Sequence, residues 1–91
     1  MTFSEFGRRV KENGSRGTDH GTSAPMFVLG DPVLGGLFGA PPDLAHLDDD
    51  GNLPYAVDFR EVYATLLDRW LAGDAASVLG GDFTPVPFLA P

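Results

Sequence analysis

The sequence predicts a part of a larger α/β domain, and three observations lead to this expectation. Residues 58–72 show the apolar periodicity of one long amphipathic helix. Residues 26–29 form a short apolar run, closed by Gly30, of the kind that a strand buried on both faces has. The chain holds too few other strands to complete a sheet, because parallel strands need neighbours and cover on both faces. We therefore expect residues 1–91 to be a single partial domain, the C-terminal segment of a larger domain whose missing N-terminal part is its partner.

The N-terminal third is expected to contain a strand end and then a surface loop. Residues 1–3 are apolar and β-prone, which predicts the last part of a strand. Residues 8–18 are polar and contain two glycines, which favours a loop over a helix. This loop is expected to continue through residues 17–21, before the strand at 26–29.

The helix expected over residues 58–72 carries signals at both ends. Asp58 is a suitable N-cap with Glu61 three residues later, and Gly73 is placed to close the C-terminal end. Asp74 is expected to cap one more short turn, which leads to Gly80. The apolar face of the long helix, expected to dock on a core, consists of Phe59, Val62, Tyr63, Leu66, Leu67, Trp70 and Leu71.

Two long stretches are expected to be irregular. Prolines and glycines recur through residues 30–57, whereas connections inside compact domains usually run to about 4–6 residues. A packed functional loop or an insertion is therefore expected there. The tail, residues 83–91, contains three prolines and predicts an extended strap. Its apolar anchors are expected to be Phe83, Val86, Phe88 and Leu89.

Composition excludes several function classes. Thirteen Asp and Glu against six Lys and Arg give a net charge of −7, which disfavours binding to nucleic acid or to an anionic membrane and favours a cation as partner. The chain has no cysteine, so neither disulfides nor thiolate metal sites are expected. A hydrophobic fraction of 43% is too high for a disordered chain. No apolar run reaches membrane-spanning length, and residues 1–9 do not resemble a signal peptide.

Asp19 and His20 are the residues that point most clearly to chemistry. They offer a carboxylate oxygen and an imidazole nitrogen on a backbone that Gly17 and Gly21 allow to bend, so both could converge on one metal ion. From these residues alone an ordinary turn fits better, with the aspartate bonded to backbone amides and the histidine exposed. A catalytic zinc needs about three protein ligands and a water, so a metal site would need further ligands.

Several motifs, taken in order, resemble an exported, sulfatase-like family of unknown function in the alkaline phosphatase superfamily. The motifs are Ser4-Glu5-Phe6-Gly7-Arg8, Gly17-Thr18-Asp19-His20-Gly21, Pro25-Met26-Phe27-Val28-Leu29-Gly30, Asp58-Phe59-Arg60 and Tyr63-Ala64-Thr65-Leu66-Leu67. The resemblance covers the C-terminal portion of much longer proteins. It implies an alkaline-phosphatase-like α/β sandwich and metal-dependent hydrolysis of sulfate or phosphate esters. It also implies an exported or periplasmic location.

The same resemblance implies roles for individual residues. Asp19 and His20 would bind a divalent metal, which could be zinc, calcium, magnesium or manganese, and Glu5 would be a third ligand. Arg8 would contact the anionic ester. The family pattern fits in two registers, which agree on His20 and differ on Glu5, and Glu5 also fits a simple ion pair with a neighbouring arginine. Active relatives have Asp-His where this chain has Glu5-Phe6, and no nucleophile segment is present. No catalytic residue is therefore expected, and the chain alone is expected to be inactive.

Two alternatives remain open. His46 with residues 48–52 suggests a calcium loop, but Val57 stands where such a loop needs its bidentate glutamate, so a solvated turn fits better. The competing function is a non-catalytic accessory or truncated domain that binds a cation weakly or not at all. Such a domain would pack on a partner through Phe59, Trp70 and the Pro-rich tail.

Overall fold

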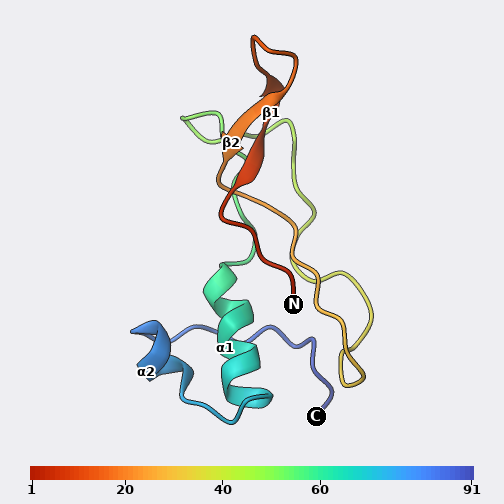
Figure 1. The fold of residues 1–91 in the computed structure, drawn as a ribbon, viewed down its shortest axis with the longest axis vertical. Coiled ribbons are helices and arrows are strands. Elements are labelled where there is room, and N and C mark those ends of the chain that lie inside the picture. The colour runs from red at the N-terminus through yellow and green to blue at the C-terminus, as the bar shows by residue number, and fades with distance from the viewer. The chain divides into compact units, whose positions relative to one another are not determined.

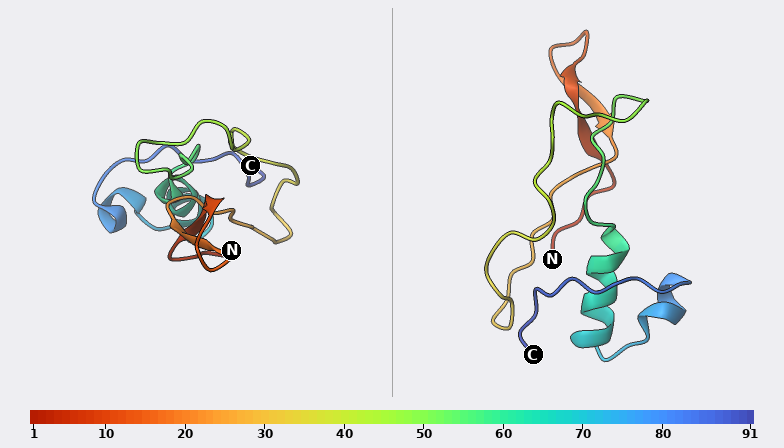
Figure 2. Two further views of the ribbon diagram at one scale, coloured as in Figure 1. Left: turned by 90° about the horizontal axis from the view of Figure 1, so that it is seen from above. Right: turned by 180° about the vertical axis from the view of Figure 1, so that it is seen from behind.

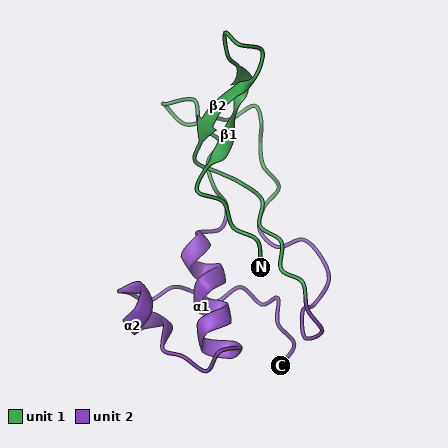
Figure 3. Ribbon diagram, in the orientation of Figure 1, with its two compact units in different colours: residues 1–29, 40–56 green, residues 30–39, 57–91 purple.

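The structure, a computed structural model, describes residues 1–91 and divides into two compact units (Figure 3). Unit 1 comprises Met1–Leu29 and Ala40–Ala56, and unit 2 comprises Gly30–Gly39 and Val57–Pro91. Unit 1 contains the two strands, and unit 2 contains the two helices (Figure 1). Neither helix has the length and hydropathy that crossing a membrane requires.

Unit 1 is built on an antiparallel hairpin of β1 (Gly7–Glu12) and β2 (Thr18–Gly21), which Figure 2 shows from two further sides. Gly7 pairs with Gly21 and Arg8 with His20, and the register is irregular between Arg8 and Glu12. The pairing tolerates no side chain at its base. A Cβ on Gly7 would lie 1.5 Å from the carbonyl oxygen of Ser23, so only glycine fits there.

A five-residue loop, residues 13–17, connects the two strands. The backbone N–H of Asn13 donates to the Gly17 carbonyl at 2.8 Å, and the N–H of Arg16 donates to the Asn13 carbonyl at 3.2 Å. Arg16 has a φ of 63°, the left-handed conformation that closes this class of hairpin loop. The loop expected over residues 8–18 was therefore a wrong prediction, because most of it forms β1 and the hairpin turn.

The strand expected at residues 26–29 is also absent. Phe27 and Leu29 are exposed, at 62% and 85%, and no ladder of backbone hydrogen bonds forms. Residues 1–3 are likewise outside any strand. The two segments meet at one point, where the Thr2 N–H donates to the Phe27 carbonyl at 2.8 Å. A strand needs a paired neighbour along its length, and no third segment of this chain supplies one.

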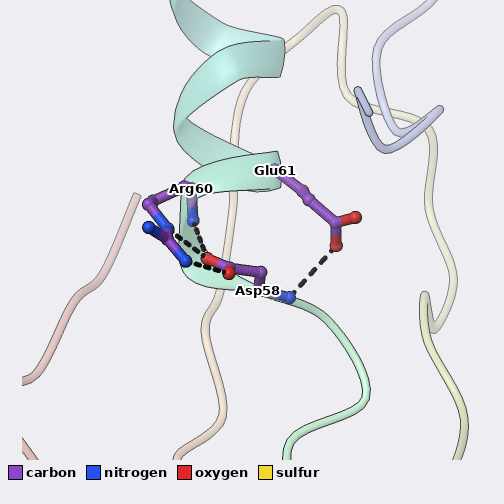
Figure 4. A network of polar contacts seen from close by, with 3 residues as sticks. All are labelled: Asp58, Arg60 and Glu61. Carbon is purple, nitrogen blue, oxygen red and sulfur yellow. Dashed lines mark hydrogen bonds and ion pairs between the residues drawn. The ribbon is translucent and has the colours of Figure 1, made fainter. Parts of the chain in front are cut away.

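In unit 2, α1 (Phe59–Arg69) confirms the predicted helix and its capping box. Oδ1 of Asp58 accepts from the Arg60 N–H at 2.9 Å, and Oε2 of Glu61 accepts from the Asp58 N–H at 3.0 Å (Figure 4). The helix ends before residue 72, with Trp70 as C-cap. The left-handed residue that follows is Ala72, with φ 52°, rather than Gly73.

The short turn predicted after Asp74 is α2 (Ala75–Leu79). Oδ1 of Asp74 accepts from the Ser77 N–H at 3.2 Å, and Gly80 closes the helix with a φ of 73°. Asp68 of α1 also takes part, because its Oδ1 accepts from the Ala75 N–H at 2.8 Å. Capping at both ends therefore defines this five-residue helix.

All buried apolar side chains lie in unit 2. They are Val62, Ala64, Ala75, Phe88 and Leu89. The tail confirms the predicted strap and two of its anchors: Phe88 and Leu89 are buried, and the Leu34 N–H donates to the Phe88 carbonyl at 2.8 Å. In unit 1, only Gly7 is buried.

The helix face expected to be core is buried only in part. Phe59, Trp70 and Leu71 are 54%, 61% and 64% exposed, whereas Val62 is buried. The periodicity correctly identified the helix, but it overestimated how much of the apolar face this chain covers.

Candidate functional site

The structure places Asp19 and His20 in β2, not in a flexible loop. Successive side chains of a strand point to opposite faces, and each of the two residues has its own partner. Oδ1 of Asp19 accepts from Nδ2 of Asn13 at 3.1 Å. The imidazole of His20 stacks on the ring of Phe6, with centroids 3.5 Å apart and planes inclined by 12°. The convergence on one ion that the sequence suggested therefore does not occur within β2.

Arg8 lies on the His20 side of the hairpin. It is the cross-strand partner of His20, and its guanidinium carbon lies 5.2 Å from the centroid of the Phe6 ring. Nη1 of Arg8 donates to the Thr18 carbonyl at 2.8 Å. Phe6, Arg8 and His20 thus form one exposed aromatic and basic cluster, in which the guanidinium keeps further N–H donors for an anion.

Glu5 precedes this cluster and is exposed. It forms no ion pair with Arg8 or Arg9, since the ion pairs of the structure join His46 to Asp43 and Arg60 to Asp58. The simple salt bridge that competed with a ligand role for Glu5 is therefore absent. Its carboxylate is available to a partner, but the structure does not bring it together with Asp19 and His20 as one group.

The residues of this chain alone do not fit a metal ion. Nowhere do three His, Asp or Glu side chains gather closely enough to hold one. Asp19 and His20 are bound to different partners on different faces of β2. A metal site that used them would need ligands from outside this chain and a change in at least one of these side chains.

The turn that suggested a calcium loop is held by its own hydrogen bonds. Oδ1 of Asp48 accepts from the N–H groups of Asp50 and Asn52, at 3.0 and 2.7 Å. Nδ1 of His46 contacts Oδ2 of Asp43. A carboxylate that satisfies its own turn is typical of a solvated loop, and no third ligand joins this group.

The most perturbed carboxyl group lies at the start of α1, away from these residues in the sequence. Nε and Nη2 of Arg60 donate to the two carboxylate oxygens of Asp58 at 2.9 and 2.6 Å (Figure 4). The side-chain and backbone hydrogen bonds from Arg60 lower the pKa of Asp58. The Arg60 guanidinium also lies over the ring of Phe83, at 4.5 Å. This network stabilises the start of α1, and we assign no chemical role to its side chains.

Sequence reasoning missed Phe6, which contacts the predicted site residue His20, and Asn13, which contacts the predicted site residue Asp19. Once β1 is paired with β2, Phe6 stands two residues before Arg8 and reaches the same face as His20. Asn13 was detectable, because Asn-Gly between polar strands is a strong hairpin signal. Identifying that turn would have predicted that Asp19 and His20 lie on a strand and diverge.

Comparisons with known proteins give one family. No curated protein and no solved structure matches the chain. The model of a family described as "Protein of unknown function (DUF1501)" matches residues 1–79, which is most of the chain. The expectation of a family of unknown function is thus confirmed, and the chain belongs to the DUF1501 family.

Proposed function

We propose that this chain is the C-terminal segment of a metal-dependent sulfate or phosphate ester hydrolase-like protein, built as an alkaline-phosphatase-like sandwich. In this proposal His20 and Asp19 of the hairpin, with Glu5, supply part of a ligand set that other polypeptide completes. Arg8 contacts the anionic group of the ester. The ordered motifs of the sequence and the exposed position of these four side chains support the assignment.

The observation that carries the proposal is the contact between residues 1–3 and residues 26–29. These are the two segments expected to be strands, and Thr2 joins them through two hydrogen bonds of 2.8 Å to the backbone of Phe27. Several of their apolar side chains are nevertheless exposed, with Phe3 76% and Leu29 85% exposed. Two apolar segments that meet and remain uncovered fit neighbouring strands of a sheet whose other members lie outside this chain.

The divergence of Asp19 and His20 limits what this chain can do by itself. Asp19 and His20 can each bind a different metal ion, or His20 can bind one after its ring leaves the ring of Phe6. We therefore expect the isolated chain to bind Zn²⁺ or Mn²⁺ only weakly and to turn over neither an aryl sulfate nor an aryl phosphate. Turnover belongs to the natural protein that contains this segment.

The test compares two histidines of the natural protein. His20→Ala is expected to abolish metal-dependent hydrolysis of an aryl ester and to lower the amount of bound metal. His46→Ala is the matched control, because His46 is also exposed but lies in a solvated turn. Equal activity and metal content in the two variants, or a natural protein without any ester hydrolysis, would refute the proposal.

A non-catalytic accessory domain is the second candidate, and the exposed ends of α1 favour it. Phe59 and Trp70 are 54% and 61% exposed, and no three-ligand group forms. Under this candidate, Trp70→Ala would weaken binding of a protein partner, while His20→Ala would change neither metal content nor partner binding. The two candidates thus make opposite predictions for His20.

A further inference from the structure

Asn13 has an unusual setting at the first position of the hairpin loop. Its Oδ1 accepts two backbone hydrogen bonds, from the N–H groups of Ser15 and Gly17, at 2.9 and 3.0 Å. Its Nδ2 donates to Oδ1 of Asp19 at 3.1 Å. The next residue is Gly14, and a Cβ placed there would meet no atom within 4 Å. The amide carbon of Asn13 is therefore polarised, and the residue that follows it carries no side chain.

We propose that Asn13 is a site of spontaneous deamidation. The backbone nitrogen of Gly14 bonds to Cγ of Asn13, the Cγ–Nδ2 bond breaks, and a five-membered succinimide and ammonia result. The proton of the Gly14 amide passes to solvent, and the departing nitrogen takes a proton from water. Water then opens the ring, which leaves aspartate or isoaspartate at position 13. No oxidant, reductant or other protein is required.

Two features of the loop favour this reaction. Negative charge develops on Oδ1 when the Gly14 nitrogen adds to Cγ, and the N–H groups of Ser15 and Gly17 already point at that oxygen. Donors aimed at a developing oxyanion lower the barrier to its formation. Glycine at position 14 adds no side chain that would hinder ring closure, and it permits the backbone to turn.

Asn52, the other asparagine of the chain, lacks these features. Its Oδ1 is buried and has no hydrogen-bond donor, and the residue that follows it is the branched Leu53. The carbonyl of Leu53 accepts from the hydroxyl of Ser23, which holds this stretch of backbone in place. Asn52 is thus an internal control within the same molecule.

The product would alter the hairpin. Replacement of Nδ2 by a carboxylate oxygen removes the hydrogen-bond donor to Asp19. It also places a new negative charge at position 13 next to the carboxylate of Asp19, and the two charges repel each other. Isoaspartate would also lengthen the backbone by one methylene inside the loop. Deamidation at position 13 therefore frees the Asp19 carboxylate from its only side-chain partner while loosening the turn that carries it.

The test is incubation of the 91-residue chain at mildly alkaline pH, followed by peptide mapping with mass spectrometry. Asn13 is expected to acquire the mass of an acid at least roughly tenfold faster than Asn52. Gly14→Ala is expected to slow the conversion of Asn13 by roughly the same factor. This variant should keep the loop, because Gly14 does not have a positive φ and its Cβ would lie in open space.

Either of two results would overturn the proposal. One is conversion of Asn13 at the rate of Asn52, which would mean that the three hydrogen bonds protect the amide. The other is an unchanged rate in Gly14→Ala, which would exclude the Gly14 nitrogen as the attacking group. A circular dichroism spectrum identical to that of the parent chain shows that the variant has kept its fold.

Discussion

Gly7 is the single residue on which the hairpin depends most directly. A Cβ at this position would lie 1.5 Å from the Ser23 carbonyl oxygen, and backbone cannot yield as the end of a side chain can. We expect Gly7→Ala to destabilise the hairpin by about 2–3 kcal/mol or more, the cost of strong overpacking. Two-dimensional NMR should show loss of the dispersed β1 and β2 amide signals. Gly14→Ala, at an open position of the same hairpin, should leave them in place.

The backbone conformation that Arg16 adopts in the hairpin loop is energetically unfavourable. Its φ of 63° is unfavourable by about 1–2 kcal/mol for a residue with a Cβ, while glycine loses about 0.5–1 kcal/mol more chain entropy on folding. We therefore expect Arg16→Gly to stabilise the hairpin by a net of about 0.5 kcal/mol. Protection of β1 and β2 amides from hydrogen exchange should rise. Arg16→Ala, which removes the charge but keeps the Cβ, should bring no such gain.

At the scale of secondary-structure elements, the sequence correctly predicted the features that residues close together in the chain determine. Asp58 and Glu61 lie three residues apart and form the capping box of α1 by themselves. The hairpin depends on pairing between residues that are distant in the sequence, such as Arg8 and His20, and composition alone favoured a loop. The expected convergence of Asp19 and His20 was wrong for the same reason, because adjacency suggested one ligand pair, whereas strand pairing turns the two side chains to opposite faces. Residues 26–29 form no strand, because no segment of this chain pairs with them along their length.

Asp58 should make the stability of α1 dependent on pH in the acidic range. Hydrogen bonds from Arg60 lower the pKa of Asp58 in the folded state below its ordinary value. Its contribution is therefore complete above the unfolded pKa of about 4 and is lost as pH falls through the lower folded value. We expect helicity measured by circular dichroism to fall over this range. Asp58→Asn keeps a capping oxygen but cannot ionise, so this component of the pH dependence should vanish.

Thr65 joins α1 to the tail through a single buried hydroxyl. Its Oγ1 donates to the Glu61 carbonyl at 2.7 Å and accepts from the Val86 N–H at 2.8 Å. Thr65→Val keeps the shape but leaves the Val86 N–H without an acceptor, which should cost about 1–3 kcal/mol in urea unfolding. Thr84→Val, at an exposed position, should change the unfolding free energy little. An equal effect of both substitutions would contradict this role for the hydroxyl.

The whole molecule holds its buried apolar side chains in one unit. Val62, Ala64 and Phe88 are buried in unit 2, while in unit 1 Phe3, Phe27 and other large apolar residues are exposed. Burial of apolar surface is the main favourable term in folding. Unit 1 is therefore held mainly by backbone and side-chain hydrogen bonds that water can reach, each of which contributes only about 0.5–1.5 kcal/mol net.

This difference predicts two levels of stability within one chain. Native-state hydrogen exchange should show rapid exchange at β1 and β2 and slower exchange at the central amides of α1, because local opening is easiest where little apolar surface is buried. In the natural protein, the proposed sheet would cover Phe3, Phe27 and Leu29, and protection of the hairpin should then rise toward that of α1. Hairpin amides as well protected as those of α1 in the isolated chain would show that unit 1 needs no such cover. That result would remove the reason for placing this segment in a larger sheet.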